Sequence, residues 1–312
     1  MKTKPINILS DKIDFNPSVV AIGFFDGVHL GHMELITQMV VYSKKLNLNS
    51  IIFTFDKSPK QVLNQDFDGY ITTTEEKFEL LSELGADNIC YIPFTRDFAS
   101  LTKENFVKEI LINKLNSKSV FVGFNFCFGI GRSGNPDNLK TELNKYDCNC
   151  HIIESVKSDE GSVISSSAIR QIIRNGNIIQ ANKLLGRKLS FTGNVVHGDH
   201  RATSMGFPTA NLLLENSQKC LPPNGVYACY VDTAVGTFPS IVNIGYRPTF
   251  NKTTYLLEAH LCNFEGDLYG KEIRVRFLKA MRPEIKFPSM GALIAQIEKD
   301  RQSIMDLEEI KD

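Results

Sequence analysis

The sequence predicts an α/β protein of two domains, in which a parallel, doubly wound sheet is followed by a β-rich domain that ends in a helix. In the first half, short apolar segments alternate with segments whose apolar residues recur at helical spacing, as is typical of parallel strands joined by helices. In the second half, strand-like segments follow one another with turn residues between them, which indicates a β-barrel or a sandwich. The length of 312 residues fits two domains.

In the first half, Thr73 and Glu76 fit a capping box at the start of one expected helix, and Gly85 fits its end. In a doubly wound sheet, ligands bind at the carboxyl ends of the strands, beside the first turn of the following helix. The expected strands are 18–25, 50–55, 88–94, 119–126 and 150–156, and the expected helices are 32–46, 73–84 and 103–115.

The pattern changes near residue 187, where strands begin to follow one another without helices. We place the domain boundary within 174–190, which gives a first domain of residues 1–183 and a second domain of residues 184–312. The expected strands of the second domain are 190–196, 225–232, 238–245, 255–261 and 272–281, and a helix is expected over 289–309.

The composition limits the classes of partner. Thirty-five basic side chains balance thirty-five acidic ones, so no overall field favours nucleic acid or an acidic membrane. We find no membrane-spanning run and no signal peptide, and we expect a cytoplasmic protein with reduced, mainly buried cysteines. Cys148 and Cys150 form a single C-x-C without a second pair at ligand spacing, so we expect no zinc site.

The segment "GFFDGVHLGH" at 23–32 ends a strand and opens a helix. The first amides of a helix have no acceptor within the helix, so they form a site for anions, and glycines let the backbone approach a ligand. His29 and His32 add imidazole donors. Two alternatives are a metal site that includes Asp26, and a plain turn with two surface histidines. We favour phosphate binding. H-x-G-H after a first strand is similar to the signature of the nucleotidyltransferase superfamily.

A second phosphate site is expected at "ISSSAIR", residues 164–170. Serines cap helix N-termini, and the guanidinium of Arg170 pairs well with phosphate oxygens. Alone, the segment is more simply a serine-capped helix, but H-x-G-H in the same domain favours a clamp on a triphosphate.

The second domain contains "MGFPTANL", in which Thr209 and Asn211 point to the same face of an extended segment. Their oxygens suit Mg²⁺ shared with nucleotide phosphates. Glu258 lies in an expected strand and offers a carboxylate that accepts a proton from a substrate hydroxyl. Alone, it is more simply an outward-facing strand residue.

These segments together resemble the bacterial bifunctional riboflavin kinase/FAD synthetase family, from residue 23 to residue 287. The matching segments are "GFFDGVHLGH", "EKFELLSELGAD", "VGFNFCFG", "ISSSAIR", "GFPTANL", "GVYACYV", "VNIGYRPTF", "LEAHLCNFEGDLYGKEIRVRF" and "MRPEIKF". The resemblance implies a Rossmann-like nucleotidyltransferase domain that adenylylates FMN to FAD, and a riboflavin-kinase-like antiparallel barrel with a terminal helix that phosphorylates riboflavin. ATP and Mg²⁺ are the implied co-substrate and cofactor.

The resemblance also implies roles for individual residues. In the first domain, Asn125 contacts flavin, and the ATP site comprises Gly23, Phe25, Asp26, Gly27, His29, Gly31, His32, Ser165, Ser166, Ser167 and Arg170. His29, His32 and Arg170 are the implied catalytic residues of that domain. In the second domain, Glu258 activates the ribityl hydroxyl, Arg282 lies near the flavin, and Arg201, Thr209 and Asn211 contact ATP and Mg²⁺.

The chain departs from the family pattern in three places. Lys57 stands where a proline is usual, and Phe124 and Cys127 stand where polar residues are common. In the phosphate loop of the kinase domain, Arg201 remains, whereas Ala202 and Thr203 replace the usual glycine and second arginine.

The altered phosphate loop supports a second hypothesis, in which only the adenylyltransferase works and the barrel is a weak, inactive or regulatory flavin-binding module. A third hypothesis is a nucleotidyltransferase with an acceptor other than a flavin, such as a pantetheine or nicotinamide phosphate. We expect a monomer or weak homo-oligomer that binds small molecules only.

Overall fold

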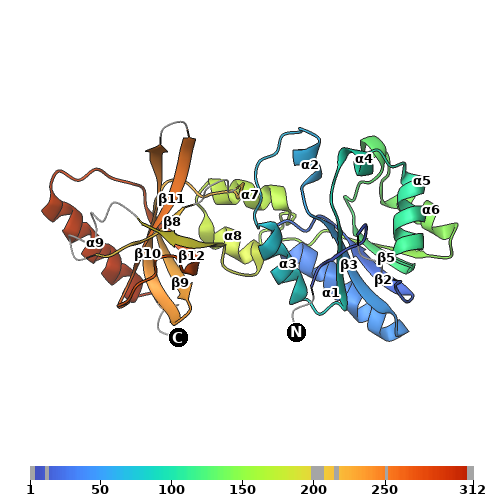
Figure 1. Ribbon diagram of the computed structural model, residues 1–312, viewed down its shortest axis with the longest axis horizontal. Helices are drawn as coiled ribbons and strands as arrows, with labels where there is room; N and C mark the ends of the chain where they lie inside the picture. Colours follow the sequence, from blue (N-terminus) through green and yellow to red (C-terminus); the bar gives the residue numbers. More distant parts are fainter. Residues whose placement is uncertain (1–3, 11–13, 198–206, 214–217, 250–251, 308–312) are drawn as a thin grey trace. The chain divides into compact units, whose positions relative to one another are not determined.

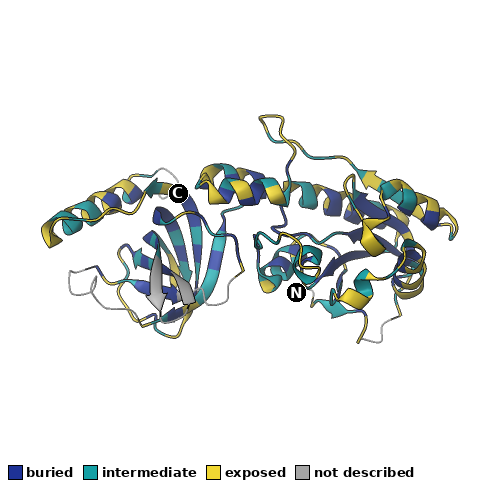
Figure 2. Cartoon of the chain, turned by 90° about the horizontal axis from the view of Figure 1, so that it is seen from above, coloured by how far each residue is buried: buried dark blue, intermediate teal, exposed yellow. Residues whose placement is uncertain are grey.

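The computed structural model describes residues 4–10, 14–197, 207–213, 218–249 and 252–307, which leaves Arg201, Ala202 and Thr203 outside the described residues. Backbone contacts divide the chain into two compact units, Met1–Ala168 and Ile169–Asp312. In both units, residues of the strands and of the helices packed on them make up the buried core, which is dark blue in Figure 2.

The first unit contains a six-stranded sheet in the order β1-β4-β3-β2-β5-β6, in which every neighbouring pair is parallel (Figure 1). The strands are β1 (Ile6–Asn7), β2 (Ser18–Ile22), β3 (Asn49–Phe55), β4 (Asn88–Ile92), β5 (Ser117–Gly123) and β6 (Asn149–Ile153). The parallel sheet is confirmed. Two differences stand out: β1 was not expected, because two residues give no pattern, and the chain leaves β2 already at Gly23.

The helices of this unit are α1 (Leu30–Leu46), α2 (Pro59–Val62), α3 (Thr74–Ser82), α4 (Arg96–Ala99), α5 (Lys103–Asn105), the π-helix η1 (Phe106–Lys114), the 3₁₀ turn η2 (Ile130–Arg132) and α6 (Pro136–Asn144). The helix expected over 103–115 is therefore α5 continued by η1. The capping box of α3 is present, because Thr73 Oγ1 accepts from Glu76 N at 3.2 Å and Glu76 Oε2 accepts from Thr73 N at 2.9 Å.

Alternating residues of the central strands bury opposite faces of the sheet. On β2, Val20 and Ile22 pack with η1 and α6, whereas Val19 and Ala21 pack with α1 and α3. This two-sided burial explains why the strands read as continuous apolar runs.

Strand β2 lies between β3 and β5, and the chain moves outward from it in both directions. The carboxyl ends of β2 and β5 therefore border the point where the strand order reverses, and in open α/β sheets a crevice for ligands forms at that point.

The second unit is a closed antiparallel barrel in the order β10-β11-β8-β7-β12-β9. Its strands are β7 (Ser190–Val196), β8 (Ala210–Leu213), β9 (Gly225–Thr233), β10 (Gly236–Thr249), β11 (Lys252–Leu261) and β12 (Glu272–Arg282). The sequence left a barrel and a sandwich as alternatives, and the closed strand order shows that the unit is a barrel.

Three helices accompany the barrel: α7 (Ser166–Arg174), whose first turn belongs to the first unit, α8 (Ile178–Leu185) and the terminal α9 (Met290–Met305). Ile304 of α9 is fully buried against the barrel residues Val226, Ile241 and Leu278. The expected terminal helix is therefore confirmed, and its apolar face joins the barrel core.

The capping box provides a first prediction. Replacing Thr73 with alanine removes the side-chain acceptor of the Glu76 amide, and we expect the first unit to lose about 1 kcal/mol of unfolding free energy. The measurement is urea unfolding followed by circular dichroism. The control is Thr141→Ala, whose hydroxyl bonds only the Asp137 carbonyl in the exposed part of α6, and it should cost less than about 0.5 kcal/mol. Equal losses would contradict a specific role of the cap.

Candidate functional site

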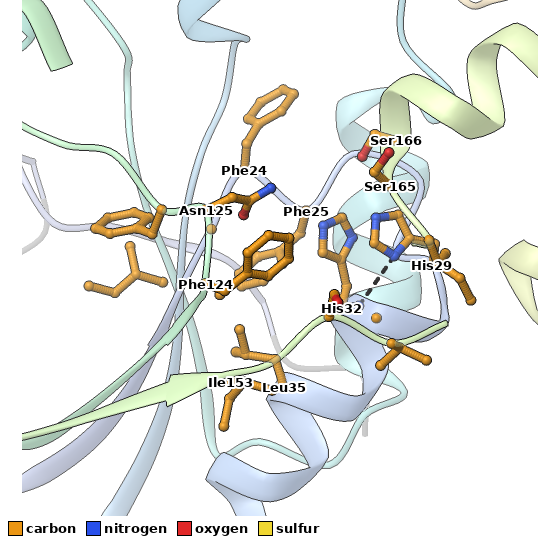
Figure 3. A pocket seen from close by; sticks show the side chains of 18 of the residues that line it. Phe24, Phe25, His29, His32, Leu35, Phe124, Asn125, Ile153, Ser165 and Ser166 are labelled. Carbon is orange, nitrogen blue, oxygen red and sulfur yellow. Dashed lines mark hydrogen bonds between the residues drawn. The ribbon is translucent and has the colours of Figure 1, made fainter. Parts of the chain in front are cut away.

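A cavity of about 360 Å³ lies at the carboxyl ends of β2, β5 and β6. Most of its lining comes from four segments in distant parts of the sequence, namely 22–32, 123–127, 153–156 and 164–167, and the rest is Leu35, Phe55, Pro59 and Arg132. In Figure 3, two imidazoles and the Ser165 and Ser166 side chains lie on one side, and Phe24, Phe124 and Asn125 lie on the other. The reversal of strand order thus brings "GFFDGVHLGH", "VGFNFCFG" and "ISSSAIR" to one place.

The two histidines form a stacked pair at the N-terminus of α1. Their ring centroids are 3.6 Å apart, with planes inclined by 17°. His29 is the N-cap residue, and its Nδ1 accepts the backbone N–H of His32 at 3.3 Å (dashed in Figure 3). Because Nδ1 is an acceptor, the ring proton lies on Nε2, so Nε2 is the donor of a ring that lines the cavity. Only 5% of His29 is exposed, so its orientation is fixed.

The turn between β2 and α1 is held in an unusual backbone conformation. Phe25 and Val28 have φ of 56° and 38°, which side-chain-bearing residues rarely adopt, and Gly27 has φ of 80°. A Cβ on Gly27 would lie 2.9 Å from the Ile71 side chain. A Cβ on Gly31 would lie 3.2 Å from the His29 ring, so the lack of a side chain at Gly31 leaves room for the imidazole.

Asp26 holds this turn through hydrogen bonds to backbone groups. Its Oδ1 accepts the backbone N–H groups of Ile71 at 2.9 Å and Thr72 at 3.3 Å, and it is 4% exposed. Its own carbonyl accepts the Ser166 hydroxyl at 3.0 Å. These bonds favour a structural role over the alternative of a metal ligand.

The serines form the second helix N-terminus at the cavity. Ser165 Oγ accepts from Ala168 N at 3.3 Å, so Ser165 caps α7, and Ser165, Ser166 and Ser167 all line the cavity. Two helix N-termini thus lie at this cavity, and their dipoles concentrate positive partial charge there. Arg170 follows one turn later on α7, 7% exposed, and is not among the described residues that line the cavity.

The opposite wall of the cavity is aromatic. Asn125 and the half-exposed ring of Phe124 lie there beside Phe24, Phe55 and Phe126. Such a wall suits a large flat ring. The exposed Cys127 also lines the cavity, and its Sγ donates to the Asn125 carbonyl at 3.7 Å, whereas Lys57 is exposed and outside the described lining.

Sequence reasoning missed two charged residues of this lining, Arg132 and Glu154. Glu154 directly follows β6, so the rule that ligands bind at strand ends was a signal for it. Arg132 lies in η2, where no pattern singles it out.

The barrel unit contains a second cavity of about 800 Å³, and four residues selected from the sequence line it together: Thr209, Asn211, Glu258 and Arg282. Asn211 on β8 pairs directly with Glu258 on β11, which in turn pairs with Asn243 on β10. Directly paired residues share one face of a sheet, so these three polar side chains form a row across three strands.

Acidic residues that the sequence analysis did not select complete this cavity. The Arg282 guanidinium donates from Nε and Nη2 to Asp300 Oδ2, at 3.0 Å and 2.8 Å, which ties the end of β12 to α9. Asn243 Nδ2 donates to Glu284 Oε1 at 3.2 Å. Asp300 lies in an amphipathic helix, and only the fold shows that its side chain faces the cavity.

Comparisons with known proteins agree for both units. The family model described as FAD synthetase matches residues 11–168, and the model described as riboflavin kinase matches residues 185–307. A Bacillus subtilis protein named bifunctional riboflavin kinase/FMN adenylyltransferase is 35% identical over 91% of this chain and 90% of its own. This chain belongs to that family.

Other similar proteins extend the comparison. The family member from Escherichia coli K12 is 37% identical over 90% of each chain. A crystal structure described as a macrolide-efflux protein from Streptococcus pneumoniae is 32% identical, with a TM-score of 0.89 over 99% of this chain and 100% of that one. No helix within the described residues has the length and apolarity needed to cross a bilayer. Residues 169–184 lie between the two family matches, so the boundary between residues 183 and 184 stays a prediction.

The geometry of the β2–α1 turn makes a second prediction. Gly27 and Gly85 both have positive φ, but only at Gly27 would a Cβ meet a side chain. We expect Gly85→Ala to cost about 1 kcal/mol of unfolding free energy from the backbone alone, and Gly27→Ala to cost about 3 kcal/mol because of added crowding. Urea unfolding of both variants measures the difference. Similar costs would show that Ile71 moves aside freely.

Proposed function

We propose that this chain makes FAD in two steps, phosphorylating riboflavin to FMN in the barrel unit and adenylylating FMN in the first unit. The assignment of FMN adenylylation to the first unit rests on the stacked His29–His32 pair beside the serine-capped α7. This arrangement places imidazole donors and two helix N-termini at one cavity. The family matches over 11–168 and 185–307 support both activities.

In the adenylyl transfer, a phosphate oxygen of FMN attacks the α-phosphorus of ATP, and the bond to the bridging oxygen breaks to release pyrophosphate. The Nε2–H of His29 and the first amides of α1 and α7 donate to phosphate oxygens as negative charge shifts onto them. The residues act by positioning and charge stabilisation, with no covalent intermediate on the enzyme. We assign His32 to the α-phosphate, Arg170 to the β- and γ-phosphates, and Asn125 to the flavin.

In the kinase reaction, Glu258 accepts the proton of the terminal ribityl hydroxyl while the hydroxyl oxygen attacks the γ-phosphorus, and ADP leaves. The row formed by Asn211, Glu258 and Asn243 supports this role, because it brings the carboxylate and amide groups together in one cavity. Arg282, held by Asp300, lies on the same cavity, and we assign it to the flavin side.

The barrel cavity fits Mg²⁺ that is shared with ATP. Thr209 and Asn211 would supply oxygen ligands, which Mg²⁺ prefers. Among the described residues, no three His, Cys, Asp or Glu side chains form a metal site, in keeping with an ion held largely by phosphates and water. Bound there, Mg²⁺ neutralises charge on the transferred phosphoryl group.

The alternative hypotheses are less well supported. The riboflavin kinase match and the names of the relatives favour two activities over a chain with a retired kinase, although the effect of Ala202 and Thr203 stays a prediction. An acceptor other than a flavin would not account for the attached barrel. We further propose a cytoplasmic monomer or weak homo-oligomer that binds only small molecules, which the neutral net charge supports.

The test uses two variants that separate the two sites. His29→Asn keeps an N-cap acceptor for α1 but removes the imidazole, so FAD formation from FMN should fall by about 100-fold or more while riboflavin phosphorylation persists. Glu258→Gln should do the reverse, lowering FMN formation by about 100-fold or more. Flavins are separated after incubation with ATP and Mg²⁺, starting from riboflavin in one series and FMN in the other.

Wild-type FAD from both starting flavins would support two working sites. Riboflavin left untouched by the wild type would instead show that the altered phosphate loop disables the kinase. No FAD from FMN would contradict the adenylyltransferase assignment itself.

A further inference from the structure

Lys77 lies in the core of the first unit, where lysine is rarely found. It is on α3, within the segment "EKFELLSELGAD", and only 2% of it is exposed. Its Nζ donates to the carbonyl of Phe55, the last residue of β3, at 2.5 Å. Lysine is almost never fully buried unless its charge is compensated, so the buried ammonium of Lys77 depends on partners within the core.

The ammonium of Lys77 lies over an aromatic wall of the cavity. Its Nζ is 4.3 Å from the centroid of the Phe24 ring and 5.6 Å from that of Phe78. Phe24 lines the cavity, two residues after the end of β2. The distance to Phe24 is within the range of a cation–π interaction, which is stronger when desolvated.

Tyr70 makes a second contact with the Phe24 ring. The centroids of the Phe24 and Tyr70 rings are 5.9 Å apart. The Tyr70 hydroxyl accepts the backbone N–H of Ser58 at 2.9 Å and donates to Gln61 at 2.5 Å. Phe24 therefore lies in a frame that joins the ends of β2 and β3 to α2 and α3.

We propose that Lys77 is a positioning residue for the flavin in adenylyl transfer, because its ammonium fixes the Phe24 ring as a wall of the cavity. This inference rests on the proposed adenylyl transfer to FMN in the first unit. In this proposal Lys77 acts through Phe24, whereas we place the phosphates on the other side of the cavity, beside His29 and Ser165 (Figure 3).

The interaction depends on the protonation of Lys77. Burial lowers its pKa to about 8, while Asp26, from the β2–α1 turn, and Asp56, directly after β3, act to raise it. Tyr70 also faces this region, and burial raises its pKa above the ordinary value, so it stays neutral while Lys77 titrates. Above about pH 8, Lys77 loses its charge, and the attraction to Phe24 weakens.

The experiment compares Lys77→Met with Lys114→Met. Lys114 also donates to a backbone carbonyl, that of Ile8 at 3.0 Å, but it is outside the described lining of the cavity. With FMN as the varied substrate, we expect Lys77→Met to raise the KM for FMN about five- to tenfold, with kcat and the KM for ATP changed less than about twofold. Lys114→Met should leave all three unchanged.

The pH dependence of the KM for FMN adds a readout that a purely structural role of Lys77 would not change. In the wild type, the KM for FMN should rise between pH 7 and 9, and in Lys77→Met it should stay flat over the same range. Phe24→Leu provides a second variant if Lys77→Met does not fold, and it should raise the KM for FMN similarly. The double variant should be no worse than either single one.

Two outcomes would overturn the inference: an unchanged KM for FMN in a folded Lys77→Met or Phe24→Leu variant, or an equal rise in the KM for ATP. A wild-type chain that forms no FAD from FMN would instead refute the proposed adenylyl transfer itself, so the two failures are distinguishable.

Discussion

The site in the first unit depends on the bonds of Asp26. Its carboxylate holds the backbone at Ile71 and Thr72, and its carbonyl accepts from Ser166, so three segments are fixed at the end of β2. These bonds offset the cost of the positive φ angles at Phe25 and Val28. The β2–α1 turn also sets the residue at which α1 begins, and therefore the position at which His29 and His32 stack. A buried carboxylate thus fixes the turn that places the two histidines at the cavity.

The two units build their cavities by different means. In the sheet unit, functional groups come from loops and helix N-termini beyond the strand ends, and backbone amides supply much of the positive potential. In the barrel unit, Asn211, Glu258 and Asn243 stand on the strands themselves, aligned by direct pairing. The first arrangement suits the binding of a charged triphosphate, and the second suits the exact placement of one carboxylate.

Sequence patterns over neighbouring residues predicted most of the helices and strands. They did not predict the contacts between residues that lie far apart in the chain. Apolar runs identified β2 through β6, and the capping box at Thr73 was visible from two residues. A two-residue strand such as β1 leaves no periodicity, and the pairing that closes the barrel joins strands whose order the sequence does not state. Motifs selected His29, His32, Thr209, Asn211 and Glu258, all of which line a cavity. Asp300 and Lys77 are different, because each is an ordinary polar residue in a helix until tertiary contacts show what it faces.

One imidazole serves two purposes at the start of α1. Nδ1 of His29 caps the helix, while the same ring lines the cavity. Serine, asparagine or aspartate can also cap the helix, but none of them places an imidazole at the same position. A descendant that no longer needed the chemistry would keep its fold through such a replacement. Under the proposed adenylyl transfer, such a replacement would separate the two purposes, because it removes the ring donor and leaves a cap at the start of α1.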